Sequence, residues 1–399
     1  MSIPKRNLST CIAAAAALLL LLRAEGATAP FDEPQDTAAA LNESDRYAWT
    51  LFVALNWPAN VPNKVADPTK KFGADGSVVW ETWRNARNGA PDTAFPPTGA
   101  DPGPWLGAAT PVARQLQDFD SLPLQRLVRR EQMRKPGDAA VMFDPVAADN
   151  QMNETRLNKD TYEFVRANRL FNIEGQEALL KSKVQTISFP LRAKEIKAQW
   201  REITAADKPR YHWVEVGTLG GQQKIFGLTA LHITTKDLPN WFWATFEHID
   251  NRTPATAGGR PGNEGWKLKS RDRFACPTPP HDCEQAPKGI GLEGTKWESY
   301  RLRGTQVDFV DSLGAVTLLA NSQPEEGFQQ TSSCITCHAR ASIGSRSGAP
   351  ANRISVFLPN GDGAVGSPDP NWFANDGAGG RYVQLDFIWS LFRARRVAP

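Results

Sequence analysis

Two cysteines and a histidine lie within five residues of one another near the end of the chain, in the run Cys334-Ile-Thr-Cys337-His338. Two thiols three positions apart lie on one side of a helical turn, so both can form thioether bonds with the vinyl groups on one edge of a porphyrin. The histidine that follows can then bind the iron as an axial ligand. The pattern C-x-x-C-H therefore predicts one covalent haem c, attached at Cys334 and Cys337, with His338 as the proximal ligand.

Two other kinds of site use the same residue types. A redox-active C-x-x-C of the thioredoxin type is expected within a β-α-β unit. A zinc site needs a second pair of ligands at suitable spacing. The sequence around the motif offers neither context, so we prefer the haem interpretation.

The first 29 residues predict an export signal. Lys5 and Arg6 precede an apolar run from Cys11 to Leu22, which is typical of a signal peptide and too short to cross a bilayer. Cleavage is expected near Ala29, and a membrane anchor is the alternative. We therefore expect a periplasmic or otherwise exported protein with no membrane span after cleavage. The formal net charge of only +3 argues against a nucleic-acid partner.

With this signal and with Cys334, Cys337 and His338, the chain resembles a periplasmic monohaem c-type cytochrome. The resemblance rests on a small part of the chain and does not identify a subfamily. It implies one-electron transfer with a redox partner protein. In the common small cytochromes c the motif lies near the N-terminus, whereas here it lies near the C-terminus. C-terminal motifs also occur in the helical cytochromes c-prime and in a group of largely β haem proteins, both with an open distal side.

The sixth ligand of the iron has several candidates in the sequence. Residues 339–399 contain no Met, His or Lys, so the ligand comes from upstream, is the lone Tyr382 of that segment, or is absent. His232 is the preferred histidine, because the sequence alternation gives its strand apolar residues on both sides and hence a dry site. His212 and His248 also follow apolar alternation, but such histidines are more often core residues.

Methionines in the loop-rich segment before the sheet are the other candidates for a distal ligand. Met142 represents this group, which also includes Met133 and Met152. The alternative is that these flexible side chains fill gaps in the core.

Two further features accompany the motif. Cys276 and Cys283 flank six residues, and a disulfide there would contribute about 2.5 kcal/mol by loop closure; a metal site that includes His281 is the alternative. Arg340 follows the motif and is a candidate contact for a haem propionate. Solvation of the surface is the alternative for this arginine.

The remaining periodicity predicts an α+β fold. A helix is expected from Asn42 to Trp57, where Ala48, Leu51, Phe52 and Leu55 share one face, and a weaker helix from Thr161 to Phe171. Alternation of apolar and polar residues predicts strands at Glu195–Arg201, Tyr211–Val216, Lys224–Thr234, Trp241–His248 and Trp297–Arg303, and a hairpin over Val307–Leu319.

The length of the chain bears on its function. We divide it into a signal at 1–29, a loop-rich β-containing body at 30–320, and a helical or irregular haem segment at 321–399 packed on the body. Electron transfer is the first hypothesis, but the body is much larger than an electron carrier needs. The second is an enzyme with an open distal site for peroxide or a nitrogen oxide, and the third a haem sensor or partner subunit. Neither an acid–base pair on the distal side of the haem nor the oligomeric state can be predicted from the sequence.

Overall fold

The computed structural model confirms the α+β class. Residues described by the structure are 29–86, 90, 92–105, 117–118, 152–182, 184–217, 223–251, 271–281, 284–325, 329–344, 354, 356, 358, 363–374 and 382–398. Met133, Met142 and Cys283 therefore lie outside the described residues, as does the predicted export signal up to position 28.

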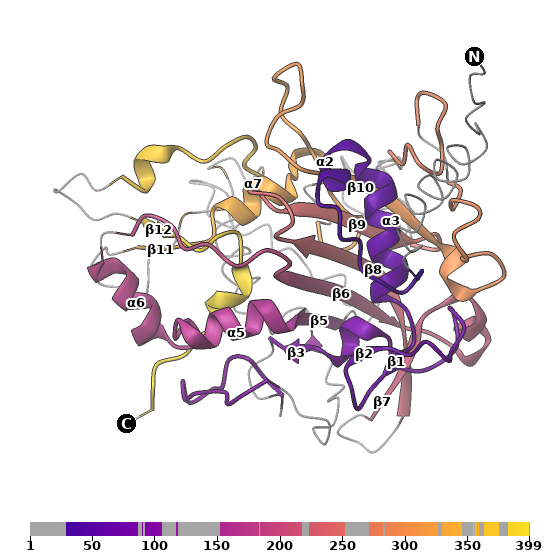
Figure 1. Cartoon of the computed structure of the whole chain (residues 1–399), viewed down its shortest axis with the longest axis horizontal. Coiled ribbons are helices and arrows are strands. Elements are labelled where there is room, and N and C mark those ends of the chain that lie inside the picture. Colours follow the sequence, from indigo (N-terminus) through magenta and orange to yellow (C-terminus); the bar gives the residue numbers. More distant parts are fainter. Residues whose placement is uncertain are drawn as a thin grey trace, which may run out of the picture.

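One antiparallel sheet organises the molecule (Figure 1). Its strands run in the order β10-β9-β8-β6-β5-β3, with β4 paired to β5 and β7 paired to β8. Their bounds are β3 Arg84–Asn85, β4 Gln117–Asp118, β5 Met152–Leu157, β6 Lys194–Glu202, β7 Trp213–Gly217, β8 Gln223–Thr235, β9 Phe242–His248 and β10 Tyr300–Gln306. The five predicted strands are thus confirmed as β6 to β10, with a shift of three residues in β10, while β3, β4 and β5 were missed.

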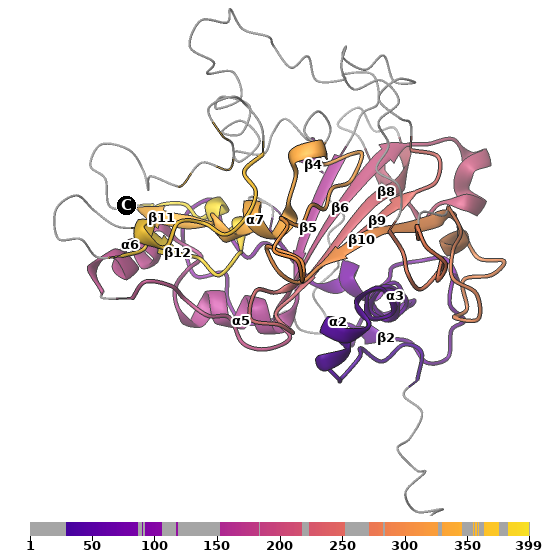
Figure 2. The ribbon, with the colours of Figure 1, turned by 90° about the horizontal axis from the view of Figure 1, so that it is seen from above.

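Helices α2 (Ala38–Asn42) and α3 (Ser44–Leu55) cover one face of this sheet, as Figure 2 shows. The apolar residues of α3 recur every three or four positions, so its buried side packs on the apolar face of the strands. Phe52 of α3 lies 4.4 Å from Phe246 of β9 between ring centroids. We call this side the α3 face.

The remaining helices and two short strands lie together beyond one end of the strands (Figures 1 and 2). They are α5 Lys159–Ala167, α6 Ile173–Lys181, α7 Cys334–Ala339, β11 Ser342–Gly344 and β12 Tyr382–Gln384. β1 (Ala59–Asn60) and β2 (Val65–Ala66) form a separate hairpin. The described residues also include short 3-10 helices: η1 Val79–Thr82, η3 Ala205–Arg210, η5 Lys296–Ser299, η6 Gln329–Thr331, η7 Pro370–Trp372 and η8 Trp389–Arg393. The predicted hairpin over 307–319 consists of one antiparallel bridge, Val310 to Val316.

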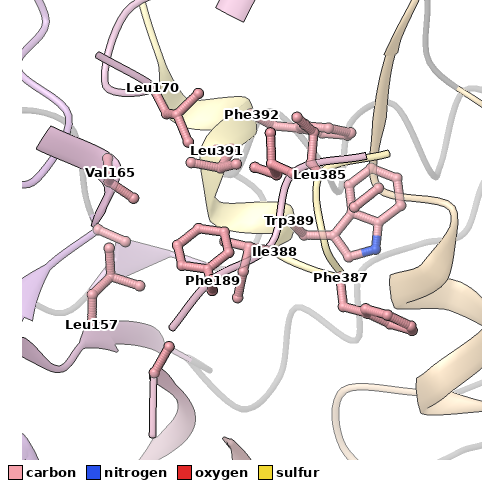
Figure 3. Packing of buried hydrophobic residues seen from close by; sticks show 14 of the residues in the cluster. Leu157, Val165, Leu170, Phe189, Leu385, Phe387, Ile388, Trp389, Leu391 and Phe392 are labelled. Carbon is pink, nitrogen blue, oxygen red and sulfur yellow. The ribbon is translucent and has the colours of Figure 1, made fainter. Parts of the chain in front are cut away.

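A second core joins the C-terminal segment to the region of α5 (Figure 3). Its labelled members are Leu157, Val165, Leu170, Phe189, Leu385, Phe387, Ile388, Trp389, Leu391 and Phe392. Residues on both sides of position 320 therefore share one core. No helix in the described part of the chain combines the length and apolar character needed to cross a bilayer.

The sequence alternation predicts apolar residues on both sides of the strand that carries His232, and this prediction is wrong for one of the two sides. Thr229 is an extra residue in β8, since Leu228 pairs with Trp200 and Ala230 pairs with Gln199. This bulge reverses the alternation. As a result His232 shares its face with Ala230 and Thr234, and that face is polar.

Candidate functional site

Helix α7 holds the whole C-x-x-C-H motif. Cys334 begins the helix and Cys337 follows one turn later, and both are free thiols. The hydroxyl of Ser333 caps the helix by accepting a hydrogen bond from the backbone N–H of Thr336. The two thiols therefore lie one turn apart on the same side of the helix.

Side-chain hydrogen bonds fasten α7 at both ends. The Nε2 atom of Gln306, the last residue of β10, donates to Ser333 Oγ at 2.8 Å, while its Oε1 accepts from the N–H of Ile335 at 3.0 Å. Near the other end, Trp389 Nε1 donates to the carbonyl of Cys337 at 3.0 Å. The thiols are therefore held on a fixed support next to the sheet.

The imidazole of His338 is oriented through its Nδ1 atom. This atom lies 2.7 Å from the carbonyl oxygen of Phe387, which can only accept, so Nδ1 carries the proton. Burial lowers the pKa of His338 to about 4, against the opposing effect of the Phe387 carbonyl. The ring also lies 4.5 Å from the ring of Trp243 between centroids. His338 is thus a neutral imidazole with its lone pair on Nε2, as a metal-ligating histidine requires.

The carbonyl that orients His338 is itself held in place. Phe387 and Asp386 both have positive φ angles, 70° and 44°, a conformation that costs about 1–3 kcal/mol for residues other than glycine. The Asp386 carboxylate compensates by accepting from Lys236 Nζ at 2.6 Å, from the N–H of Phe189 at 2.7 Å and from Trp241 Nε1 at 3.2 Å. A strained backbone turn is therefore maintained where it contacts the histidine of the motif.

The face of the sheet opposite α3 is polar, and we call it the polar face. Lys197 of β6 pairs with His232 of β8, which pairs with Thr245 of β9. Trp243, which contacts His338, lies two residues before Thr245 and therefore on the same face. The polar face thus begins beside α7 and continues along the strands.

His232 and Glu325 lie close together on this face. Their Nε2 and Oε2 atoms are 3.7 Å apart, and His232 is 8% exposed. Burial lowers the pKa of His232 well below its usual value, and the positive charge of Lys197 adds to that effect. Burial raises the pKa of Glu325 to about 7, opposed by Lys197 and by the N–H of Asn321, which donates to it at 2.8 Å. The two groups are therefore close but not hydrogen-bonded, and the proton of the pair is held by the Glu325 carboxyl and not by the His232 imidazole.

A second row of polar side chains follows along the same strands. Asn153 of β5 pairs with Gln199 of β6, which pairs with Ala230 of β8. Beside them Arg303 Nε donates to the carboxylate of Glu247 at 2.6 Å. All five residues are buried, so this face is covered although it is polar.

The other histidines of the sheet have structural partners. His212 Nε2 lies 2.6 Å from the carboxylate of Glu81 on the α3 face. His248 Nε2 lies 2.9 Å from the carbonyl of Arg210, and its Nδ1 accepts from the N–H of Asp250. These contacts match the core role that we considered the more common one for such histidines.

The remaining predicted residues are Cys276, Cys283, His281 and Arg340, and the last of these is the C-cap of α7. Cys276 is disulfide-bonded, while Cys283, its expected partner, is outside the described residues. His281 Nδ1 lies 2.8 Å from the carbonyl of Cys276. The Arg340 guanidinium lies 5.0 Å from the ring centre of Trp372. Within the described ranges, no group of three or more His, Cys, Asp or Glu side chains is arranged for a metal ion.

Sequence reasoning missed Glu325, Lys197, Asn153 and Gln199. The alternation in β6 indicates that Lys197 and Gln199 share a face, but it does not indicate that this face is buried. Glu325 lies in a loop, and no local pattern connects it with His232. The Asn321 side-chain amide donates to Thr245 Oγ1 and to the Phe246 carbonyl, at 2.9 Å each, and so holds this loop over the sheet.

No protein-family model, curated protein or solved structure gives a significant match to the chain. The functional argument therefore depends on the geometry of the site.

Proposed function

We propose that the chain is an exported monohaem c-type cytochrome that transfers electrons with a redox partner protein in the periplasm. Cys334 and Cys337 would hold the haem through thioether bonds, and His338 would be the proximal ligand. A haem held in this way supplies a centre that gains and loses one electron. The observation that carries the proposal is the contact of His338 Nδ1 with the Phe387 carbonyl, which leaves Nε2 for iron on the helix that also carries two free thiols.

The residues around the motif have roles that fit this proposal. Gln306 and Trp389 keep α7 in one position. Phe387 fixes the orientation and tautomer of His338, which strengthens an imidazole ligand. Trp243 packs against the same ring and shields it from water. The donor set of two thiols and one neutral imidazole therefore fits a c-type haem.

An open-site enzyme acting on a small oxidant is the second candidate, because His232 and Glu325 supply the acid–base pair that the sequence alone did not reveal. In this reading the body of the protein forms a substrate site, which an electron carrier does not need. The position of the pair on the polar face beside α7 favours this candidate.

The test is expression of the full chain with the machinery that attaches haem to c-type cytochromes. We expect covalent haem to remain with the denatured chain, and the paired variant Cys334→Ala/Cys337→Ala to lose it completely. His281→Ala is the control, since this histidine is remote from the motif. Wild-type protein that releases its haem on denaturation would contradict the proposal.

The absorption spectrum of the reduced protein then separates the two candidates. A spectrum unchanged by carbon monoxide would favour the electron carrier, because both axial positions would be filled. Rapid binding of carbon monoxide would favour the open-site enzyme.

A further inference from the structure

The hairpin of residues 307–319 projects from the body of the protein between β10 and α7, and we call it the projecting hairpin. Figure 1 shows it as the orange loop at the top of the molecule. Its two legs pair through the bridge between Val310 and Val316. The Asp311 carboxylate accepts from the N–H groups of Leu313 and Ala315, at 2.9 Å each, and so orders the turn. The tip of the projecting hairpin is therefore held in one conformation by its own hydrogen bonds.

The outer side of the projecting hairpin is apolar. Cross-strand pairing and alternation place Val310, Val316 and Leu318 on this side, while Phe309 points the other way, toward the body. The three aliphatic side chains are exposed, and Leu313 at the tip is 91% exposed. Scattered exposed apolar residues need no explanation, but a group of them on one element is typical of a protein contact surface. The projecting hairpin is thus a candidate docking surface.

The inner side of the projecting hairpin contacts the C-x-x-C-H motif from both legs. On the first leg the ring of Phe309 stacks on the ring of Phe387, with 6.4 Å between centroids. The backbone carbonyl of Phe387 is the group that orients His338. On the second leg the carbonyl oxygen of Leu319 lies 3.4 Å from Cys334 Sγ. A protein that docks on the projecting hairpin would therefore bind beside the haem attachment site.

The apolar surface also continues from the projecting hairpin toward α7. Gly366 packs against Val316, since a Cβ atom at this glycine would lie 3.7 Å from the valine side chain. The carbonyl of Gly366 accepts from Thr336 Oγ1 of α7 at 2.9 Å. Val365, which precedes this glycine, is exposed. The apolar surface therefore extends from the hairpin tip to a residue that is fixed to the haem-binding helix.

The charge of the projecting hairpin is negative, although the whole chain has a formal charge of +3. Asp308 and Asp311 are both exposed, and neither forms an ion pair with another residue in the described part of the chain. The sequence contains no Lys or Arg between Arg303 and Arg340. Charges at the rim of an interface select a partner of opposite sign and accelerate its association. The projecting hairpin therefore complements an apolar patch that is surrounded by Lys or Arg side chains.

We propose that the projecting hairpin is the docking site of the redox partner protein, and that the partner presents an apolar patch with a basic rim. This rests on the proposed haem c and deepens the first candidate function. One electron passes between the partner's redox centre and the haem, so one of them is oxidised and the other reduced, and no bond or proton is exchanged. Weak redox encounters bury less than about 1,200 Å², which suits a surface of this small extent.

A second copy of the chain is the other possible occupant of this surface. In a dimer with twofold symmetry the same patch meets itself. The carboxylates of Asp308 and Asp311 would then approach their own copies, and like charges brought together across an interface oppose association. The charge of the projecting hairpin therefore favours a different, basic protein.

The test uses the full haem-loaded chain, with mitochondrial cytochrome c, a basic one-electron protein, as the probe. Surface plasmon resonance measures the Kd of the complex, and stopped-flow absorbance measures the second-order rate of electron transfer. Leu313→Gln should raise the Kd and lower the rate about tenfold each, because an apolar contact is lost from the interface. Leu41→Gln is the matched control: this leucine is 60% exposed on α2, on the other side of the sheet, and its loss should change neither value.

The charge of the surface is tested separately with the double variant Asp308→Asn/Asp311→Asn, which keeps an oxygen acceptor at each position. Its rate should fall about three- to tenfold at low ionic strength. The difference from wild type should disappear in about 1 M salt, where exposed charges are screened. The defect of Leu313→Gln should persist in the same salt, because it does not depend on charge.

Several outcomes would overturn the inference while leaving the haem proposal intact. One is a wild-type chain that carries covalent haem but does not bind the probe at low ionic strength. Another is an equal Kd and rate in wild type and Leu313→Gln, or an equal loss in Leu313→Gln and Leu41→Gln. A third is a wild-type dimer that Leu313→Gln converts to a monomer in sedimentation, because the surface would then contact a second copy. Wild-type chain without covalent haem would overturn the proposed function itself, and haem content measured in every sample distinguishes this case.

Discussion

The two faces of the central sheet are built on different principles. The α3 face is an aromatic and aliphatic core, in which Phe52 of the helix packs against Phe246 and Trp297. Polar groups on that side form close pairs, such as His212 with Glu81 at 2.6 Å. The polar face is also buried, but buried polar side chains such as Asn153, Gln199 and Glu247 line it.

This difference indicates which side was shaped for stability. Burial of apolar surface stabilises a fold, while an unpaired buried polar group destabilises it. The apolar side chains of the α3 face are therefore expected to stabilise the fold more than the polar side chains of the opposite face do. Substitutions on the α3 face should therefore change stability, whereas those on the polar face should change chemistry.

The largest effect is expected on the α3 face. Phe246→Ala removes a ring that is 0% exposed and should lower the free energy of unfolding by about 3–5 kcal/mol, because the surrounding core cannot fill the cavity. Urea denaturation followed by circular dichroism measures this change. Leu313→Ala is the control, since this side chain is 91% exposed. An equal decrease in the free energy of unfolding in both variants would show that the α3 face does not stabilise the fold more than an exposed site does.

The two buried histidines on opposite faces give the next comparison. His212→Leu leaves the Glu81 carboxylate buried without its ring partner and should cost about 3 kcal/mol or more. His232→Leu removes a nitrogen that has no hydrogen bond and should change stability by about 1 kcal/mol or less. The same denaturation measurement applies to both. A larger loss for His232→Leu would show that this histidine is structural.

The sequence predicted the architecture through its periodicity. The spacing of Ala48, Leu51, Phe52 and Leu55 was sufficient for α3, and alternation was sufficient for β6, β7, β8 and β9. The alternation argument assumes that successive side chains of a strand point to opposite faces without interruption. It therefore could not predict the extra residue Thr229, which exchanges the two faces of β8 from that point on. β5 was missed because its charged and polar residues, from Asn153 to Arg156, resemble a surface segment although they are buried.

The candidate site was predictable only where it is local in sequence. Cys334, Cys337 and His338 form one motif on one helix. The partner of His338 is a backbone carbonyl at Phe387, which side-chain chemistry cannot reveal. Glu325 reaches His232 across 93 positions of chain through the loop that Asn321 fixes to β9. Alternation indicates which side of a strand a residue faces, but it does not indicate what covers that side, so the burial of Gln199 could not be predicted.

The third prediction concerns pH. The pKa of Glu325 is raised to about 7 from an ordinary value of 4.5 by burial, so the folded protein binds this proton more tightly than the unfolded chain does. Its stabilising contribution is full at low pH and is lost as the pH rises from about 4.5 through 7; between pH 5 and 8 the loss is about 2.5 kcal/mol. Glu325→Gln should remove this part of the pH dependence, so the variant gains stability relative to wild type at pH 8.

Unfolding by urea at pH 5 and pH 8 measures this effect. The control is Glu293→Gln, because this exposed carboxylate accepts hydrogen bonds from backbone N–H groups that lower its pKa. A stability difference between wild type and Glu325→Gln that is the same at both pH values would show that Glu325 ionises freely, as a solvent-exposed group does.

The smallest effect distinguishes the two faces most directly, because it compares two buried amides. Asn56 on the α3 side donates to the carbonyl of Phe52 and accepts from Trp80 Nε1, so Asn56→Leu should cost about 1–3 kcal/mol. Gln199→Leu replaces an amide whose atoms have no partner, and should leave stability within about 1 kcal/mol of wild type or raise it. Thermal unfolding of both variants gives the comparison. Equal losses would mean that the Gln199 amide is bonded in solution, and the polar face would then be an ordinary hydrogen-bonded core.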